Sequence, residues 1–77
     1  MKTAAAEYGK IIKALRESKG LTQEAVAQSS KLQLSDYQDF ENGKKEPLLV
    51  QFMAISEVLG VPASDLISKV YEGLGKH

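Results

Sequence analysis

The sequence predicts an all-α fold, a compact bundle of five short helices in a single domain. Apolar residues recur three and four positions apart along nearly the whole chain, and no segment shows the sustained alternation of a half-buried strand. At 77 residues the chain is long enough for one small core and too short for a second domain. It contains no cysteine, so packing must hold that core together in place of disulfides or a thiolate metal site.

The first two helices are predicted at residues 4–18 and 23–29. Thr3 and Thr22 precede them and can cap their first turns through the side-chain oxygen. Gly20 follows the first helix as its left-handed C-terminal residue. The apolar stripe of the first helix consists of Tyr8, Ile11, Ile12 and Leu15.

A third helix is predicted at residues 34–42, ending before Gly43. Ser35 followed three residues later by Gln38 is a potential capping box, which would delay the start of this helix. The break between the second and third helices is short, so the two must cross steeply. Ala27 supplies the small residue that a steep crossing requires, and the pair therefore predicts a helix-turn-helix.

The last two helices are each preceded by a proline. Pro47 fits the first turn of a fourth helix, which runs to Leu59 and is closed by Gly60, and Pro62 opens the fifth. The predicted apolar residues are Leu48, Phe52, Ile55, Val58 and Leu59 in the fourth helix, and Leu66, Ile67, Val70, Tyr71 and Leu74 in the fifth.

Charge and composition exclude several classes of function. Ten basic and ten acidic residues give no net charge, but basic residues outnumber acidic ones six to three in residues 1–33. With no cysteine and a single histidine, the terminal His77, we expect no metal site, no cofactor and no catalytic site, and hence no enzyme. The sequence has no signal peptide and no apolar run of about 18 residues, so we expect a cytoplasmic protein without a membrane partner.

The segment LTQEAVAQSSKLQLSDYQDFENGKKEP resembles the DNA-binding domain of the Cro and lambda-repressor-like (XRE) family. The resemblance extends from Tyr8 to about Ile67, because the opening YGKIIKALRESKGLTQ and the close LGVPASDLI are both in register with the family pattern. It implies a compact five-helix lambda-repressor-like domain over residues 1–77. The core would span about 8–67, with 68–77 as a C-terminal extension.

The resemblance also implies the function and its residues. In this family the second helix lies over the phosphate backbone and the third enters the major groove, so double-stranded DNA is the expected partner. Ser35 and Gln38 would contact base edges and Leu34 a thymine methyl group, whereas Gln23 and the loop after the third helix would contact phosphates. The expected DNA-binding residues are Thr22, Gln23, Lys31, Gln33, Leu34, Ser35, Gln38, Asp39, Asn42, Lys44 and Lys45.

Arg16 and Glu41 occupy the positions of an ion pair common in this family, late in the first helix and at the end of the third. Such a pair would join the first helix to the recognition helix and orient it. The alternative is that both are solvated charges on separate faces.

The charges of the third helix are unfavourable for DNA binding. Asp36 and Asp39 lie on or beside its groove-facing side, where phosphates repel carboxylates, and only Lys31, Lys44 and Lys45 are near enough to offset them. Two hypotheses for the function remain open. One is a sequence-specific DNA-binding regulator, expected to be a repressor, and the other is an antitoxin-like or anti-repressor-like protein-interaction module that binds DNA weakly or not at all.

The turn before the third helix departs from the family pattern more mildly. Lys31 stands where the family usually has glycine, Ser30 where an apolar residue is usual, and Gln33 where Ser or Thr commonly caps the helix. A non-glycine residue with positive φ costs on the order of 1 kcal/mol, which a packed core can absorb.

A regulator of this type is expected to pair across a two-fold axis, because one short recognition helix reads only a few base pairs. The fifth helix has more apolar residues than the end of so short a chain needs. Leu66 and Ile67 could equally close the monomer core. The expected homodimer contacts are therefore Val70, Tyr71 and Leu74.

Overall fold

The computed structural model describes residues 2–75, and it contains five α-helices and no strand within that range. The predicted all-α class is confirmed. The last two residues of the predicted extension, 76 and the terminal His77, lie outside the described residues. The helices are α1 (Ala4–Ser18), α2 (Gln23–Ser29), α3 (Leu34–Glu41), α4 (Leu49–Leu59) and α5 (Ala63–Gly73).

The starts of α1 and α2 follow the capping prediction. The Thr3 hydroxyl accepts a hydrogen bond from the Ala6 backbone N–H at 3.0 Å, and the Thr22 hydroxyl accepts one from Ala25, also at 3.0 Å. Each bond satisfies one of the backbone donors that the first turn of a helix leaves unpaired. Both threonines therefore fix where their helices begin.

The predicted bounds of α3 were partly wrong. Gln33 is the N-cap residue and makes no side-chain cap bond, and the Ser35–Gln38 capping box does not form. The helix begins at Leu34, so Ser35 lies within its first turn and not at the N-cap position that a capping box requires. At the other end the helix stops at Glu41, and Asn42 is the C-cap residue.

The start of α4 also differs from the prediction. Leu48 is the N-cap residue, so Pro47 lies outside the helix. The Gln51 side chain accepts a hydrogen bond from the Leu48 backbone N–H at 2.8 Å, which holds this residue in an extended conformation. Leu48 was expected in the apolar stripe, but its side chain points to solvent and is 71% exposed. Pro62 is likewise an N-cap residue, directly before α5.

The C-termini of α1, α2 and α3 end in the same backbone motif. In each, the two residues after the cap donate to the carbonyls of the last turn, with the first of the two in the left-handed region. Gly20 and Gly43 fill this position in α1 and α3, whereas α2 has Lys31 with φ 59°. Lys31 therefore carries backbone strain at the turn between α2 and α3.

We expect Lys31→Gly to stabilise the fold. Removing the side chain relieves about 1–2 kcal/mol of left-handed strain, while the added freedom of the unfolded chain takes back about 0.5–1 kcal/mol. The net gain of roughly 0.5–1 kcal/mol should raise Tm by about 2–8 °C in a thermal melt followed by circular dichroism. Lys31→Ala, which keeps the Cβ atom, is the matched control. An equal gain in both variants would contradict the strain explanation.

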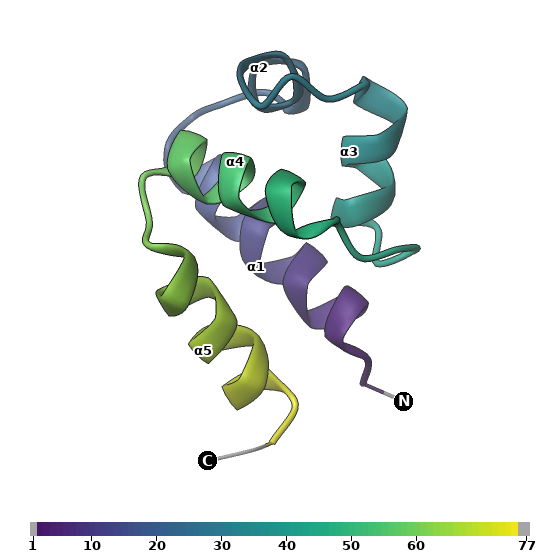
Figure 1. The fold of residues 1–77 in the computed structure, drawn as a ribbon, viewed down its shortest axis with the longest axis vertical. Coiled ribbons are helices and arrows are strands. Elements are labelled where there is room, and N and C mark those ends of the chain that lie inside the picture. The colour runs from purple at the N-terminus through teal and green to yellow at the C-terminus, as the bar shows by residue number, and fades with distance from the viewer. Residues whose placement is uncertain (1, 76–77) are drawn as a thin grey trace.

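The core is drawn from all five helices. Its fully buried side chains are Ile12, Val26, Tyr37, Phe40, Ile55, Leu59 and Leu66. Helix α1 lies centrally and packs against α3, α4 and α5 (Figure 1). A Cβ atom on Gly9 of α1 would fall 2.5 Å from the carbonyl oxygens of Phe40 and Glu41, so α1 and α3 approach closely at a point that tolerates only glycine.

The structure shows which apolar residues of α5 belong to the core and which are exposed to solvent. Leu66 is fully buried and belongs to the core, whereas Ile67 is 57% exposed. Val70 is half-buried and packs against the core, and Leu74 is half-buried. Tyr71 is 54% exposed, so it is the most exposed of the three expected dimer contacts.

Within residues 2–75 no helix is long and apolar enough to cross a membrane by itself. Helices α4 and α5 reach that length and composition only when taken together, and they meet at a bend of 104°.

Candidate nucleic-acid interface

Helices α2 and α3 form the predicted helix-turn-helix. Figure 1 shows α2 nearly end-on while α3 lies across the view, so the two axes cross steeply. Ala27 is buried on α2, and its carbonyl accepts a hydrogen bond from Leu32 at 2.8 Å across the turn. The short turn and the small residue together allow this crossing, which turns one side of α3 toward solvent.

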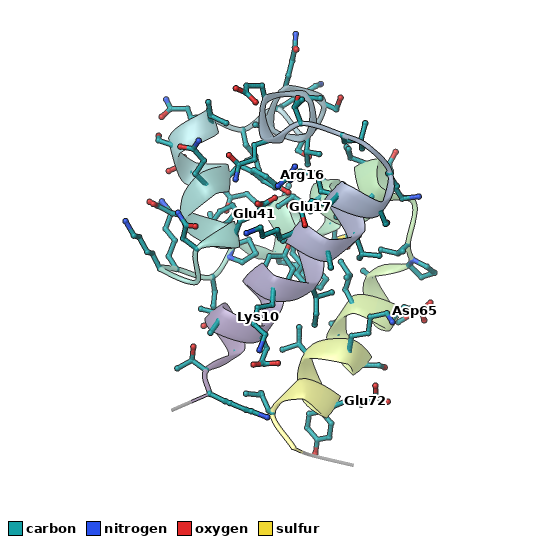
Figure 2. The ribbon with its side chains drawn as sticks, turned by 180° about the vertical axis from the view of Figure 1, so that it is seen from behind. Lys10, Arg16, Glu17, Glu41, Asp65 and Glu72 are labelled. Carbon is teal, nitrogen blue, oxygen red and sulfur yellow. The ribbon has the colours of Figure 1, made fainter. Side chains whose placement is uncertain are left out.

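Arg16 and Glu41 join α1 to the C-terminal end of α3. Arg16 Nε donates to Glu41 Oε2 at 2.6 Å and Arg16 Nη2 donates to Oε1 at 3.2 Å, which is a bidentate pair. Figure 2 shows the two side chains meeting between the helices. Arg16 Nη1 also donates to the Leu21 carbonyl at 2.8 Å, so the same side chain fixes the connection from α1 to α2. The alternative of two solvated charges is wrong.

The surroundings of this pair keep both groups ionised. Burial alone would raise the pKa of Glu41, but the hydrogen bonds from Arg16, together with the neighbouring Tyr37 and Gln23, hold it below its ordinary value. The hydrogen bond to Glu41 raises the pKa of Arg16 further. Burial raises the pKa of the Tyr37 hydroxyl, and the adjacent Glu41 carboxylate raises it more. The pair is therefore an ionic contact throughout the physiological pH range.

Two expected DNA contacts extend from this pair as a hydrogen-bonded chain. Gln23 Nε2 donates to Glu41 Oε1 at 2.9 Å, and Gln38 Nε2 donates to Gln23 Oε1 at 3.2 Å. The first residue of α2 is thereby linked to the middle of α3. Sequence reasoning assigned Gln23 and Gln38 separate DNA contacts and missed the bond between them. The only feature of the sequence that could have indicated this bond is that the two residues lie on helices predicted to cross.

The remaining expected DNA contacts differ in their exposure. Ser35 and Asn42 are exposed, and so is Gln33 at the start of the helix. Leu34 was expected to cover a thymine methyl group, but it is half-buried and packs against the core, so little of it remains to meet a base. Thr22 is exposed, with its hydroxyl occupied as the cap of α2.

Asp36 and Asp39 of α3 have a basic partner in the following loop. Lys45 Nζ lies 2.7 Å from Asp36 Oδ1 and 3.9 Å from Asp39 Oδ2, and it also lies 5.7 Å from the centre of the Phe40 ring. The hydrogen bond to Asp36 raises the pKa of Lys45. Lys31 and Lys44 are exposed and pair with no carboxylate among residues 2–75. Sequence reasoning listed Lys45 as a nearby cation but did not identify the pairing, because it depends on how the loop folds back.

Comparison with known proteins identifies the family. The family model described as a helix-turn-helix domain matches residues 9–72, which is most of the chain. The chain belongs to this family. The match confirms the resemblance to Cro and lambda-repressor-like (XRE) domains. No sequence among the curated proteins matches the chain.

Solved structures share the fold of this helix-turn-helix domain. The clp gene regulator ClgR from Corynebacterium glutamicum is 19% identical and superposes with a TM-score of 0.89 over 96% of this chain and 79% of that one. The restriction-modification controller protein C.AhdI from Aeromonas hydrophila is 29% identical and has a TM-score of 0.77 over 80% of this chain and 94% of that one. The five-helix arrangement is thus one that proteins of very different sequence adopt.

Removing the cation of the buried pair should destabilise the domain strongly. We expect Arg16→Met to lower the free energy of unfolding by about 3–5 kcal/mol, because it leaves the Glu41 carboxylate buried without a counter-ion. Urea denaturation at pH 7 measures this loss. The double variant Arg16→Met with Glu41→Leu is the control and should recover much of it, since no charge is then left unpaired.

The same pair should make the stability of the wild type depend on pH. Because folding lowers the Glu41 pKa, its contribution is fully present above the unfolded-state value, near 4.5, and is lost as the pH falls through the lower folded-state value. The double variant should lose less stability over that acidic range. Parallel pH profiles for the two proteins would contradict this assignment.

Proposed function

We propose that this helix-turn-helix domain is a sequence-specific DNA-binding transcription regulator that reads the major groove with α3 as a homodimer and acts as a repressor. The observation that carries the proposal is the placement of α3. The Arg16–Glu41 pair fixes it against α1, while its solvent side presents short polar groups and is flanked by exposed lysines. A rigid helix with a polar outer face is what base-edge recognition requires.

Direct base contacts are assigned to the exposed start and outer side of α3. Ser35 can donate to or accept from a base edge, and Asp39 can accept from cytosine N4. Gln38 can still offer its side-chain carbonyl, although its amide nitrogen is held by Gln23. Leu34 contributes at most the exposed part of its side chain. Specificity is therefore assigned mainly to Ser35, with Asp39 and Gln38 in support.

Phosphate contacts are assigned to the two ends of the motif. Lys31 lies in the turn before α3, and Lys44 follows its C-terminus, so the two cations bracket the helix. Gln23 is exposed enough at the start of α2 to reach a phosphate while Glu41 orients it. Such contacts hold α3 in register along the groove but do not select the sequence.

The ion pair between Asp36 and Lys45 reduces the repulsion expected between the carboxylates of α3 and the phosphates of DNA. A carboxylate near the groove repels phosphates unless a cation lies close to it. Lys45 lies within 4 Å of both Asp36 and Asp39 and offsets part of their charge. Lys45 is then less available as an independent phosphate contact than Lys44, which has no such partner in the described part of the chain.

A homodimer is supported by an exposed apolar surface on α4 and α5. Leu49 and Ile67 line one hollow together with Phe52, and Ile67 lines a second with Phe52 and Tyr71. Leu49, Ile67 and Tyr71 expose between 54% and 72% of their surface. Together with the half-buried Phe52 they form a continuous apolar patch, called here the pairing surface. Contiguous apolar patches on small soluble proteins mark interaction sites.

The pairing surface differs from the contacts expected from sequence. Val70 and Leu74 remain proposed contacts, but each is half-buried and offers only part of its side chain. Tyr71 stays central, and Leu49 and Ile67 are added. Two copies joined on this surface would read two half-sites of an operator, and their presence on the duplex would exclude other proteins from it, which is the proposed route to repression.

Selection from a randomised duplex pool tests the DNA-binding proposal. We expect enrichment of a two-fold symmetric site, with an affinity that falls as salt rises in fluorescence-anisotropy titrations. Ser35→Ala should relax discrimination at one base position per half-site by about 1–3 kcal/mol. Lys44→Ala is the matched control, expected to weaken all sequences alike and to reduce the salt slope by about one.

No binding by a folded wild type, even at low salt, would contradict the DNA-binding proposal. The protein-interaction module would then be the better reading, with Asp36 and Asp39 facing a basic partner in place of a phosphate backbone.

Sedimentation equilibrium tests the homodimer separately. We expect the wild type to be a dimer at micromolar concentration and Tyr71→Lys to shift the dimer dissociation constant upward by about 30-fold, which corresponds to about 2 kcal/mol for a central contact. Lys69→Ala, on the same helix, is the control and should leave that constant unchanged. A wild type that sediments as a monomer at every concentration tested would contradict the pairing surface.

A further inference from the structure

Three charged side chains meet on the solvent side of α3. The Lys45 ammonium lies 2.7 Å from Asp36 Oδ1 and 3.9 Å from Asp39 Oδ2. The three side chains are between 37% and 46% exposed, so a ligand can reach each of them. The proposed function uses Asp39 as a single acceptor and Lys45 only as a counter-charge. Their placement side by side indicates a more specific role.

The loop after α3 determines where Lys45 lies. Gly43 has a φ of 72°, in the left-handed region, and turns the chain back along the helix, where the Lys44 backbone N–H donates to a carbonyl of α3 at 2.9 Å. This turn brings Lys45 to Asp36, nine residues earlier in the chain. The Lys45 ammonium also lies 5.7 Å from the centre of the buried Phe40 ring, so two side-chain contacts hold it against α3.

Asp39 and Lys45 both keep hydrogen-bonding capacity for a ligand. The 3.9 Å between Asp39 Oδ2 and Lys45 Nζ is too long for a hydrogen bond, so the carboxylate remains an acceptor. An ammonium group has three N–H donors, and Asp36 takes one of them. The outer surface of α3 therefore presents an acceptor and a donor next to each other.

A C·G base pair presents the complementary pattern in the major groove. Cytosine N4 is a donor there, and guanine O6 and N7 are acceptors. Within the pair, N4 and O6 are hydrogen-bonded to each other, so they lie about 3 Å apart. The 3.9 Å between the Asp39 and Lys45 atoms is close to that spacing. Carboxylates accept from cytosine N4, and lysines donate to guanine O6 and N7.

We propose that Asp39 and Lys45 together recognise one C·G pair in each half-site, with the carboxylate on cytosine N4 and the ammonium on guanine O6 and N7. Asp36 is the positioning residue that holds Lys45 for this contact. The inference rests on the proposed function, because it requires α3 to lie in the major groove.

Helix geometry places this base pair relative to the one that Ser35 contacts. Ser35 and Asp39 are four residues apart, so they lie on the same face of α3, about 6 Å apart along its axis. Successive base pairs are separated by about 3.4 Å along the duplex. The two recognised positions are therefore no more than about two base pairs apart.

The charges of the two side chains make the recognition directional. Inverting the pair to G·C places guanine acceptors against the Asp39 carboxylate and the cytosine donor against the Lys45 ammonium, so both contacts become repulsive. An A·T pair keeps a donor, adenine N6, beside an acceptor, thymine O4, and so preserves part of the pattern. We expect affinity to fall in the order C·G, A·T, G·C.

Duplexes that differ at this one base pair test the inference. The full-length wild type is titrated by fluorescence anisotropy with the site enriched from the randomised pool, and with versions that carry A·T or the inverted G·C at that pair. We expect inversion to weaken binding by at least about tenfold, and A·T to weaken it less. A duplex with hypoxanthine in place of this guanine keeps O6 and N7 and should bind like the enriched site.

Variants assign the discrimination to these side chains. Asp39→Asn keeps the shape of the side chain, and because an amide offers a donor as well as an acceptor, the penalty for inversion should fall to about twofold or less. Lys45→Met keeps the stem without the ammonium and should abolish the preference for C·G over A·T. Asp36→Ala should raise the affinity for all duplexes, since it removes a repelling charge, yet weaken the same preference.

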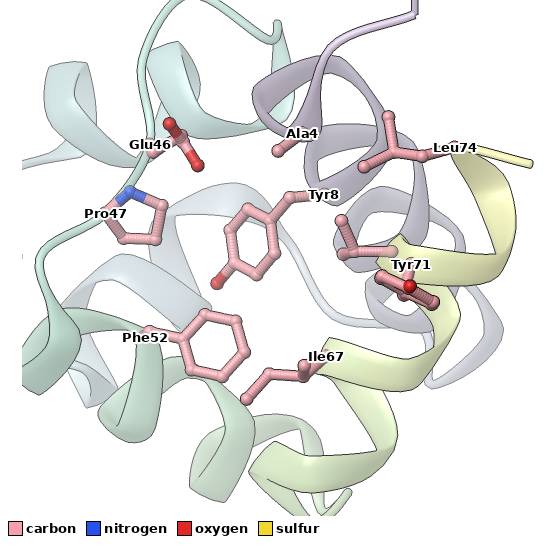
Figure 3. A pocket seen from close by; sticks show the side chains of 9 residues that line it. Ala4, Tyr8, Glu46, Pro47, Phe52, Ile67, Tyr71 and Leu74 are labelled. Carbon is pink, nitrogen blue, oxygen red and sulfur yellow. The ribbon is translucent and has the colours of Figure 1, made fainter. Parts of the chain in front are cut away.

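Lys44→Ala is the matched control, because it removes a neighbouring cation that pairs with no carboxylate among residues 2–75. It should leave the order C·G, A·T, G·C unchanged. The apolar hollow of the pairing surface, which Figure 3 shows from close by, is lined by other residues, so these variants keep the proposed dimer contacts.

The outcomes separate this inference from the proposed function. An enriched site without a C·G pair within two base pairs of the position that Ser35→Ala relaxes would overturn the inference alone. So would a penalty for inversion that persists in folded Asp39→Asn and Lys45→Met proteins. No binding of any duplex by a folded wild type, even at low salt, would overturn the inference and the proposed function together.

Discussion

The Arg16–Glu41 pair is the contact on which the rest of this domain depends. One guanidinium meets the carboxylate at the end of α3 through two nitrogens and the Leu21 carbonyl through the third. It therefore ties together α1, the connection to α2, and α3. Because the carboxylate is almost completely buried, the pair tolerates only the geometry in which both partners meet. The orientation of α3 follows from that geometry.

The polar contacts of α3 form two groups with different consequences. On the inner side, Glu41 orients Gln23, which in turn holds Gln38, so the two crossing helices behave as one rigid unit. On the outer side, the exposed Lys45 and Asp36 form a contact that solvent and salt can weaken. A partner that binds α3 therefore contacts a rigidly held helix whose exposed Lys45–Asp36 ion pair can rearrange.

Sequence reasoning located the helices well but misjudged contacts that depend on the packing of distant elements. Thr3 and Thr22 mark helix starts because a cap needs only residues three positions away. Ser35 and Gln38 had the spacing of a capping box, but Gln38 instead bonds to a residue 15 positions earlier. Helical periodicity likewise placed Leu48 and Ile67 on apolar stripes, but both side chains are exposed, and Leu48 is the N-cap residue of α4 and not part of the helix.

The sequence by itself determined the five helices and the helix-turn-helix, because apolar period, caps and turn glycines act over a few residues. Arg16 and Glu41 lie 25 residues apart, so the resemblance to the family, and no local pattern, indicated their pairing. The tertiary structure decided which polar groups are free. It placed Lys45 beside Asp36 and buried the Tyr8 hydroxyl without a hydrogen-bond partner among residues 2–75. It also exposed the surface around Ile67 and Tyr71. These properties depend on how side chains from several helices meet in space, and no local pattern encodes that meeting.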